Sequence, residues 1–421
     1  MKHLQGTRSV RVSKLTLAIQ DRIKREGPIT FAEFMEAALY SPFEGYYSRQ
    51  GVERTTNDYF TSPHAHPSFG ALLAVQLHEM YKAMGNPTPF TVLEQGAGDG
   101  TLARDVLAYA QRLDTQFYSR LEYLIFDRGQ QPISESQSET PASIPFKNIN
   151  GCVLSNELLD ALAVHRFVIR CGRIMELRVG LANDRFVDIE AAPKNNIIQD
   201  RISPFLDQLP DGYRGEVNVG IGDWADDVAR ALTRGFVLTI DYGFESHQLY
   251  SPKRSTGSLR TYRDHMLNDN PYDLPGSRDI TAHVDFTAYS QEMRRAGFDK
   301  IGITRQGKFL TRLGLKPMIR GLRARKLSQS TLNANRMSML ELIRPGGLGE
   351  FVVVAHSKGV ETNHLRLRGF DADTCFTPDF RLHGPILDNS YALPLMAAKH
   401  PTAALLTGHT WNDLLGYPQP D

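Results

Sequence analysis

Apolar positions near the N-terminus recur with helical spacing. They predict two helices between residues 15 and 39, divided by a turn at Gly27. Thr30, followed three residues later by Glu33, is a capping-box pattern for the second helix. Similar spacing predicts a third helix over residues 68–84. The chain is therefore expected to begin with a helical segment.

Short, continuously apolar runs separated by helical patterns follow this segment. Such runs are typical of strands that are buried on both faces of a mainly parallel sheet. We therefore expect an α/β fold with helices on both faces of the sheet. Residues 164–190 alternate like a β-hairpin instead, and residues 128–150 show no clear element. The expected strands are 90–94, 121–127, 151–154, 236–240 and 351–355, with helices at 102–117, 223–233 and 286–296.

These elements suggest three regions. We expect an N-terminal helical or lid segment at residues 1–88 and a catalytic core at 89–360. The core carries an insertion at 163–235, which is far longer than the single helix that such a fold needs between two strands. Residues 361–421 are expected to be a C-terminal extension.

Composition excludes several classes of protein. The 48 basic and 47 acidic residues leave almost no net charge, which argues against a general nucleic-acid binder. Three cysteines without a CxxC pair offer neither a disulfide framework nor a zinc site. No apolar run approaches the ~18 residues of a membrane helix. Residues 1–14 are basic but lack an apolar signal region, and a mitochondrial presequence of this length would be unusually short. We therefore expect a cytoplasmic, bacterial-type location rather than the mitochondrial matrix.

A glycine-rich loop joins the first predicted strand to a helix. Its sequence is E-Q-G-A-G-D-G-T, and a further acid closes the next strand. Glycines let the backbone approach a ligand closely, and the following helix presents free N–H groups to it. An acid at the end of the next strand can hold both hydroxyls of a ribose. The alternative is a glycine turn without a ligand. The candidate cofactor-binding residues here are Glu94, Gly96, Gly98, Gly100, Thr101 and Asp127.

A polar cluster follows the third predicted strand. Asn156, Glu157 and Asp160 come directly after the apolar run at 151–154, so they reach the sheet edge where ligands meet in open parallel sheets. The alternative is that Asn156 and Asp160 cap a helix that begins near Glu157. An acid at this edge suits an acceptor that is a cation or sheds a proton. We take all three as candidate catalytic residues.

At this point the chain resembles the MidA-like family of class I methyltransferases, which includes a mitochondrial arginine methyltransferase. The resemblance spans roughly residues 25 to 356. It implies a Rossmann-like class I fold, S-adenosyl-L-methionine as cofactor and, for the mitochondrial member, a protein arginine as acceptor. The matching segments are 27–35, 39–42, 45–47, 60–63, 69–70, 94–101, 155–162, 240–243, 259–263 with His265, 275–276, 279–286 and 347–349.

The sequence departs from the family pattern at two places. Ala163-Val164 stands where the family has Leu-Pro-Val, so a rigid turn is lost. His64 and His66 stand where the family usually has an acid and further polar residues. Two histidines in this spacing indicate a metal only weakly, so we expect solvent-facing or capping roles and no metal.

Two segments near the N-terminus are candidates for a lid over the cofactor. One is the aromatic loop with Tyr46 and Tyr47, and the other runs from Phe60 to Pro63. The alternative is simple packing of the N-terminal helices onto the sheet. As cofactor contacts we name Tyr47, Thr61, Ser62 and Pro63.

The residues leave the acceptor open. We expect transfer of a methyl group from S-adenosyl-L-methionine to an arginine guanidinium of a protein. The alternatives are a small molecule or another side chain as acceptor, or an idle S-adenosyl-L-methionine-binding assembly factor. The insertion is expected to lie beside the acceptor entrance and, with residues 260–265 and 279–285, to form a peptide groove. The alternative for the insertion is a sheet cover or a homodimer contact.

Overall fold

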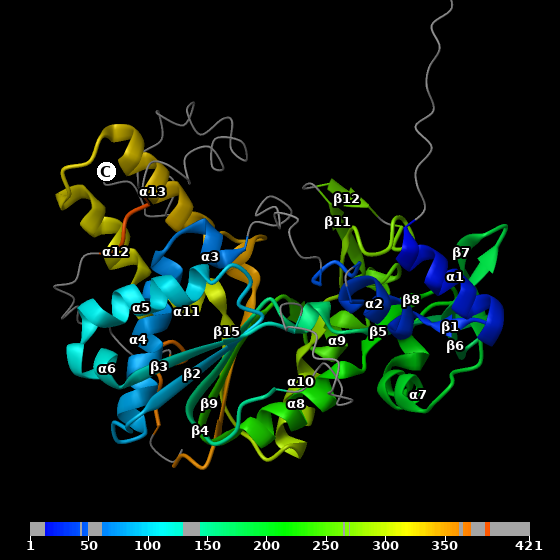
Figure 1. The fold of residues 1–421 in the computed structure, drawn as a ribbon, viewed down its shortest axis with the longest axis horizontal. Coiled ribbons are helices and arrows are strands. Elements are labelled where there is room, and N and C mark those ends of the chain that lie inside the picture. Colours follow the sequence, from blue (N-terminus) through cyan, green and yellow to red (C-terminus); the bar gives the residue numbers. More distant parts are fainter. Residues whose placement is uncertain are drawn as a thin grey trace, which may run out of the picture.

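The computed structural model consists of two lobes, each built on its own sheet (Figure 1). One lobe holds a six-stranded sheet with helices on both sides, and the other holds a five-stranded antiparallel sheet. None of the described helices is long and apolar enough to cross a membrane. The structure describes residues 13–42, 44–48, 61–128, 144–263, 266–268, 270–361, 365–371 and 384–387, without the side chains of 262, 263 and 266–268.

The six-stranded sheet confirms the predicted fold. Every strand except β16 runs in the same direction, and β16 is antiparallel to both of its neighbours. The central parallel strands are apolar runs of the sequence that are buried on both faces as expected, whereas the edge strands β3 and β15 are partly exposed. In spatial order the strands are β15 (Asp299–Arg305), β16 (Val352–Lys358), β9 (Leu232–Asp241), β4 (Ile149–Asn156), β2 (Phe90–Gln95) and β3 (Leu121–Phe126).

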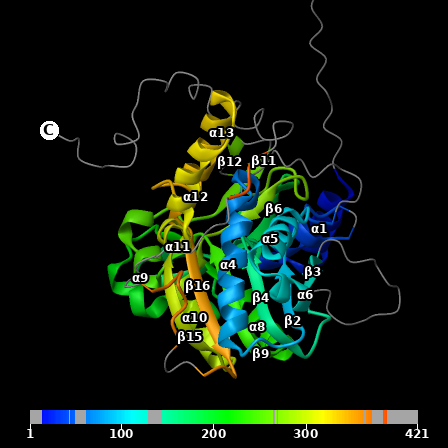
Figure 2. The same ribbon diagram turned by 90° about the vertical axis from the view of Figure 1, so that its left-hand side faces the viewer.

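Helices cover both faces of this sheet. On β2, Val92 packs into the core on one face and the next residue, Leu93, into the core on the other. The first face is covered by α4 (Ser68–Ala83), α5 (Thr101–Leu113) and α11 (Gln306–Leu313), and Figure 2 shows α4 running across it. The second face is covered by α8 (Gly220–Ala231) and α10 (Phe286–Arg295).

The second lobe joins the N-terminal helices to the insertion. The predicted hairpin is confirmed by β5 (Val164–Arg170) and β6 (Arg173–Ala182), which pair antiparallel. β1 (Ile29–Thr30) adds to β6 through Ile29 and Val179. The helices α1 (Lys14–Glu26) and α2 (Phe31–Tyr40) pack on this sheet through one apolar cluster, which contains Phe31, Phe34 and Val179. Helices α1 and α2 therefore pack on the second lobe, whereas α4 of the same N-terminal segment packs on the main sheet.

The capping box of α2 is present as predicted, with both Thr30–Glu33 hydrogen bonds formed.

The remaining strands and helices belong to both lobes or lie between them. The other strands are β7 (Arg185–Ala191), β8 (Arg214–Asn218), β10 (Gly243–Phe244), β11 (Arg260–Arg263), β12 (Met266–Asn268), β13 (Asp279–Thr281) and β14 (Val284–Asp285). The other helices are α3 (Ser62–Ala65), α6 (Thr115–Arg120), α7 (Ile197–Ile202), α9 (Ser246–Leu249), α12 (Leu315–Gly321) and α13 (Gln329–Glu341), and the 3₁₀ turns are η2 (Leu159–Ala161), η3 (Ser203–Gln208), η4 (Pro252–Arg254), η5 (Leu322–Ala324) and η6 (Leu348–Glu350).

Candidate active site

A cavity of about 360 Å³ lies between the lobes, at the carboxyl ends of β2, β3 and β4. Five of the predicted site residues line it: Tyr47, Gly96, Gly98, Asp127 and Glu157. The other predicted residues do not line it: Glu94, Gly100, Thr101, Thr61, Ser62, Pro63, Asn156 and Asp160. Phe60 of the predicted lid lies outside the described residues.

The glycine loop forms the floor of the cavity with its backbone. Gly96 and Gly98 have φ values of +69° and +57°, a region that residues with a Cβ rarely adopt. A Cβ added to Gly98 would meet no atom within 4 Å, so the space in front of this residue is open. Gly100 has φ +76° and is the N-cap of α5, which begins at Thr101. These last two residues shape the loop rather than face the cavity.

Strand alternation turns Glu94 away from the cavity. Its carboxylate accepts a hydrogen bond from the Tyr123 hydroxyl at 2.8 Å, and burial raises its pKa to about 7. The next residue, Gln95, lines the cavity instead. Its Oε1 accepts a hydrogen bond from Trp224 Nε1 at 2.9 Å, which fixes the indole as a cavity wall.

Asp127 follows directly after β3, at the position from which a carboxylate can hold a ribose. Its neighbour Arg128 forms an ion pair with Glu36 of α2, and its guanidinium lies 4.3 Å from the ring centroid of Tyr40. Tyr40 in turn stacks on Tyr47 at 5.4 Å. Helix α2 thus supplies an aromatic and charged wall on the side facing the glycine loop.

Glu157 projects from the end of β4 with φ +53°, a left-handed conformation that a hydrogen bond from its N–H to Ile240 O holds at 2.9 Å. The side chain accepts hydrogen bonds from Asn156 Nδ2 at 3.1 Å and from the backbone N–H of Ser62. Burial, and secondarily the negative charge of Asp160, raise its pKa to about 8. An acidic side chain with this pKa is mostly neutral near pH 7 until a cation approaches.

Two further carboxylates lie behind Glu157. Asp160 accepts a hydrogen bond from the Tyr242 hydroxyl at 2.5 Å, and burial raises its pKa to about 6. Asp241 accepts the backbone N–H groups of Leu158 and Leu159 at 3.1 and 2.8 Å, and burial raises its pKa well above the ordinary value. The capping role that was the alternative for Asp160 therefore belongs to Asp241.

A fourth carboxylate reaches this cluster from the start of β13. Asp279 accepts the Tyr47 hydroxyl at 3.0 Å with both of its oxygens. Asp279 also acts on Glu157, whose pKa its charge helps to raise. We refer to Glu157, Asp160, Asp241 and Asp279 as the acidic cluster.

The segment from Thr61 to Ala65 does not line the cavity, but it contacts the glycine loop at one end of the cavity and Glu157 at the other. His64 bonds through Nδ1 to the Thr61 hydroxyl at 2.7 Å and through Nε2 to Asp99 of the glycine loop at 3.1 Å. This contact with His64 holds the pKa of Asp99 well below its usual range. Ser62 bonds to Gln306 at 3.1 Å, and its N–H reaches Glu157. Thr61 and Ser62 therefore position the site from behind.

His66 has a separate, structural role. It is buried, bonds to Asn335 of α13 at 3.0 Å and accepts the Ser68 N–H at 3.0 Å. Burial lowers its pKa to about 4, so this histidine is neutral near pH 7. Its contacts resemble the capping role expected from the sequence.

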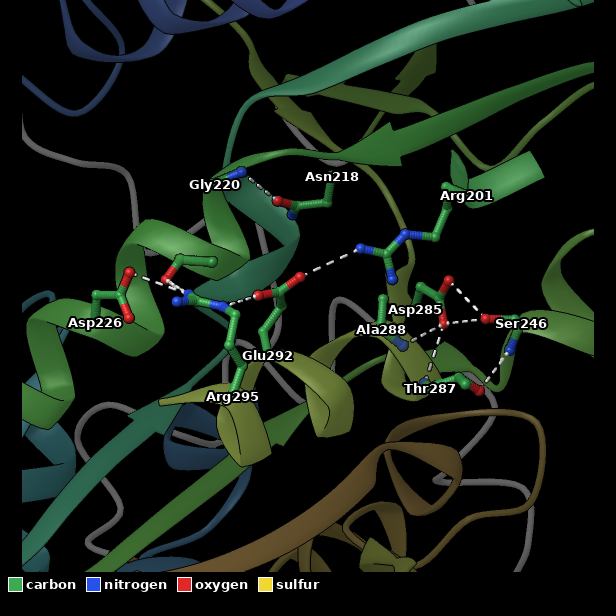
Figure 3. Close-up of polar contacts among 11 residues, drawn as sticks. Arg201, Asn218, Gly220, Asp226, Ser246, Asp285, Thr287, Ala288, Glu292 and Arg295 are labelled. Carbon is green, nitrogen blue, oxygen red and sulfur yellow. Dashed lines mark hydrogen bonds and ion pairs between the residues drawn. The ribbon is translucent and has the colours of Figure 1, made fainter. Parts of the chain in front are cut away.

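The first turns of α8 form the remaining wall, and contacts with α10 hold this helix in place. Arg295 of α10 donates hydrogen bonds to Asp226 at 3.0 Å and to Gly222 O at 3.2 Å, and Glu292 links Arg295 to Arg201 of α7 (Figure 3). This helix of the insertion therefore borders the cavity, and the peptide groove expected from the sequence stays a prediction.

The residues around the cavity fit S-adenosyl-L-methionine. The open space in front of Gly98 leaves room for the methionine part close to the backbone, and Asp127 offers a carboxylate for the ribose. Phe126 and Trp224 add apolar surface of the kind that an adenine ring packs against.

Comparison with known proteins identifies a family for this chain. Residues 72–304 match the family described as "Putative S-adenosyl-L-methionine-dependent methyltransferase". The chain belongs to this family. This confirms the expected enzyme class, its cofactor and the resemblance to MidA-like methyltransferases.

Individual relatives and solved structures agree. The chain is 28% identical to the mitochondrial protein arginine methyltransferase NDUFAF7 homolog of Drosophila melanogaster, over 83% of this chain and 86% of that protein. It is 27% identical to the Homo sapiens protein, over 80% and 82%. A Burkholderia thailandensis protein described as a "likely methyl transferase", bound to S-adenosyl-homocysteine, superposes with a TM-score of 0.70 at 25% identity, covering 85% and 94%.

These relatives overturn one expectation. The Drosophila melanogaster, Homo sapiens and Rattus norvegicus proteins are all named as mitochondrial. The expected cytoplasmic, bacterial-type location is therefore contradicted.

Several cavity residues were not foreseen from the sequence. Trp224 had a usable signal, because it is one of only two tryptophans and lies at the start of a predicted helix. Glu36 and Tyr40 had no signal, because only the docking of α2 on the second lobe brings them to the cavity. The residues concerned are Glu36, Tyr40, Gln95, Phe126, Arg128, Leu158, Ala161, Leu162, Ala163, Val219, Gly220, Asp223, Trp224 and Asp227.

Proposed function

We propose that this methyltransferase N-methylates the guanidinium of an arginine in a protein acceptor. The observation that carries the proposal is the acidic cluster, with Glu157 on the cavity wall and the other three carboxylates behind it. A site rich in carboxylates favours a cationic acceptor over a neutral or anionic one.

The hydrogen-bond partners within the cluster support a cationic acceptor. Glu157 is held by an amide and a backbone N–H, Asp160 by a phenol, and Asp241 by backbone N–H groups. Within the described residues, no basic side chain forms an ion pair with these three carboxylates, so a positive charge on the acceptor would stabilise their ionised forms. A guanidinium supplies that charge, because its own pKa is above ~12. Each charged hydrogen bond would contribute ~1.5–3 kcal/mol.

The chain's own residues then have defined roles in the chemistry. Bound S-adenosyl-L-methionine supplies a methyl group on a positively charged sulfur. The Glu157 carboxylate holds the guanidinium so that one nitrogen faces the cavity, and this orientation can supply ~7–11 kcal/mol of the barrier. Transfer of the methyl group from sulfur to that nitrogen would require the nitrogen to release a proton. Glu157, once ionised by the bound guanidinium, could take this proton, because burial raises its pKa.

Asn156 contributes an unused acceptor at the same edge. Its Oδ1 is buried and has no hydrogen-bond partner in the described part of the chain, while its Nδ2 donates to Glu157. A guanidinium N–H would satisfy this oxygen. The names of the relatives support the same acceptor, since the Drosophila melanogaster and Homo sapiens proteins are called protein arginine methyltransferases.

The test is transfer of labelled methyl groups. The purified chain is incubated with methyl-labelled S-adenosyl-L-methionine and a lysate of its own cells, and labelled protein is hydrolysed for amino-acid analysis. We expect the label in methylarginine. Label in another amino acid or in a small molecule would contradict the arginine acceptor, and S-adenosyl-L-methionine binding without any transfer would favour an idle assembly factor.

A further inference from the structure

A second charged cluster lies on the other side of Tyr242 from the acidic cluster, and it is basic. The guanidinium of Arg254 lies 3.8 Å from the ring centroid of Phe244, and that of Arg305 lies 5.8 Å from the same centroid. His283 packs against this ring at 5.3 Å. Arg260 is near enough for its positive charge, with that of Arg254, to help lower the pKa of His283. Three arginines therefore gather around one aromatic pair.

The described residues offer this cluster no ion-pair partner. No carboxylate in the described ranges forms an ion pair with Arg254, Arg260 or Arg305, whose described hydrogen bonds go to carbonyl oxygens. The buried carboxylate of Glu216 lies in the same region, but it accepts the Ser258 N–H at 2.7 Å and the Ser258 hydroxyl at 2.9 Å. The Nδ1 of His283 is buried and has no hydrogen-bond partner among the described residues.

The platform beneath the cluster is well fixed. Phe244 belongs to β10, which pairs with β14 through Phe244 and Asp285. Asp285 accepts the Ser246 hydroxyl at 2.7 Å and caps α10 through the N–H groups of Thr287 and Ala288 (Figure 3). The aromatic ring on which Arg254 and Arg305 lie is thus fixed, while the three arginines come from η4, β11 and β15.

Tyr242 connects this cluster to the acceptor site. Its hydroxyl lies 2.5 Å from Asp160, and its ring centroid lies 5.4 Å from that of His283. Through Tyr242, the basic cluster is therefore linked to Asp160, which lies behind Glu157. Three residues of extended chain span about 10 Å.

We propose that Arg254, Arg260 and Arg305, around Phe244 and His283, form a subsite that binds a carboxylate side chain of the acceptor close to its methylated arginine. A carboxylate matches the planar guanidinium groups and supplies the missing negative charge. This subsite rests on the proposed arginine acceptor. It selects arginines with an aspartate or glutamate nearby in the sequence.

The test compares two fluorescent peptides of the same length, each with one arginine. The first carries glutamate three residues before and three residues after the arginine, and the second carries glutamine at both positions. Binding to the full chain with S-adenosyl-homocysteine is measured by anisotropy, and methylation is measured in parallel. We expect the glutamate peptide to bind about tenfold more tightly. In the Arg254→Gln/Arg260→Gln variant this difference should fall below about twofold.

Lys253→Gln is the matched control. Lys253 is exposed and neighbours Arg254, so its replacement removes one positive charge from the same region without touching the cluster. We expect this variant to keep the full difference between the peptides. The cofactor-induced melting shift of the double variant should match that of the wild type, which shows that the variant is folded.

Three results would overturn the subsite. They are equal affinities of wild type for the two peptides, an affinity difference that survives in the double variant, and a loss of this difference in Lys253→Gln as large as in the double variant.

A competition experiment adds a second test. Inorganic phosphate at constant ionic strength should displace the glutamate peptide preferentially. Equal displacement of both peptides would indicate a general anion site instead. The arginine proposal fails separately, if wild type methylates neither peptide while the binding difference remains.

Discussion

The two ends of the cavity are built by different means. The cofactor end uses backbone: two glycines with positive φ, the first turn of α5 and one carboxylate, all within residues 94–127. The acceptor end uses buried carboxyl groups, gathered from the ends of β4 and β9, from η2 and from β13. Backbone atoms can hold a cofactor whose shape is constant, whereas unbalanced charge selects an acceptor by its chemistry.

This comparison predicts that a substitution can impair methyl transfer without weakening cofactor binding, and that another can weaken cofactor binding without changing the acceptor end. The largest effect is expected at the acceptor end. Glu157→Gln keeps the size of the side chain but removes the charge that orients a guanidinium, so methyl transfer should fall about 10³-fold. The affinity for S-adenosyl-L-methionine, measured by calorimetry, should change little. An equal loss of both would mean that Glu157 supports the cofactor or the fold.

The converse change is Gly98→Val. It places a branched side chain in the open space before the loop at φ +57°, so affinity for S-adenosyl-L-methionine should fall about a hundredfold, or ~2.7 kcal/mol. Gly172→Val is the control, because Gly172 has φ +71° and equally free surroundings in the hairpin turn of the second lobe. If both variants lose the cofactor-induced melting shift alike, backbone strain rather than the cavity is responsible.

A smaller effect is expected for Asp127→Ala. Loss of one charged hydrogen bond to the ribose should weaken cofactor binding about tenfold, measured by calorimetry. Asp127→Asn should lose less, because the amide can still accept a hydrogen bond. Unchanged affinity in the alanine variant would remove Asp127 from the cofactor end.

The raised pKa of Glu157 should also make the stability of the protein depend on pH. The folded pKa of Glu157, about 8, lies above its ordinary value of 4.5, so the folded state binds the proton more tightly. This contribution is fully present below pH 4.5 and is lost as pH rises to about 8. Glutamine cannot ionise, so the Glu157→Gln variant does not lose this stability at high pH. The variant's melting temperature minus that of wild type should therefore be larger at pH 9 than at pH 5. The same difference at both values would contradict the raised pKa.

The contrast between the ends also explains what could be predicted. The cofactor end is local in sequence, because strand, glycine loop and helix follow one another, and the carboxylate at Asp127 closes the next strand. Sequence patterns therefore predicted the fold and the loop. Glu94 was misplaced relative to the cavity, because only the pleat decides that Gln95 faces it.

The acceptor end depends on contacts between distant segments. Tyr47 and Asp279 are 232 positions apart, and Asp241 holds the turn after Glu157 from 83 positions away. The pairing of Ile29 with Val179 carries α2 to the cavity, and no local pattern indicates that pairing. The edge strand β15 was missed because its sequence, D-K-I-G-I-T-R, is too polar for the buried-strand pattern.

The pairing of these segments limits which variants can test the role of the insertion. Replacing residues 168–187 by a short turn would remove most of the predicted hairpin. β6 pairs with β1, β5 and β7, and Phe167 and Val179 are fully buried, so this deletion should unfold the second lobe. Point substitutions at the cavity are therefore the better probes.

The central claim is that unbalanced carboxylates at the acceptor end select a cation. It is tested most directly by the affinities of an arginine peptide and of the same peptide with citrulline, which has the same shape but no charge, for the S-adenosyl-homocysteine complex. Wild type should prefer the arginine peptide about tenfold or more, and Glu157→Gln should lose most of this preference. Equal binding of the two peptides by wild type, or an undiminished preference in Glu157→Gln, would contradict the claim.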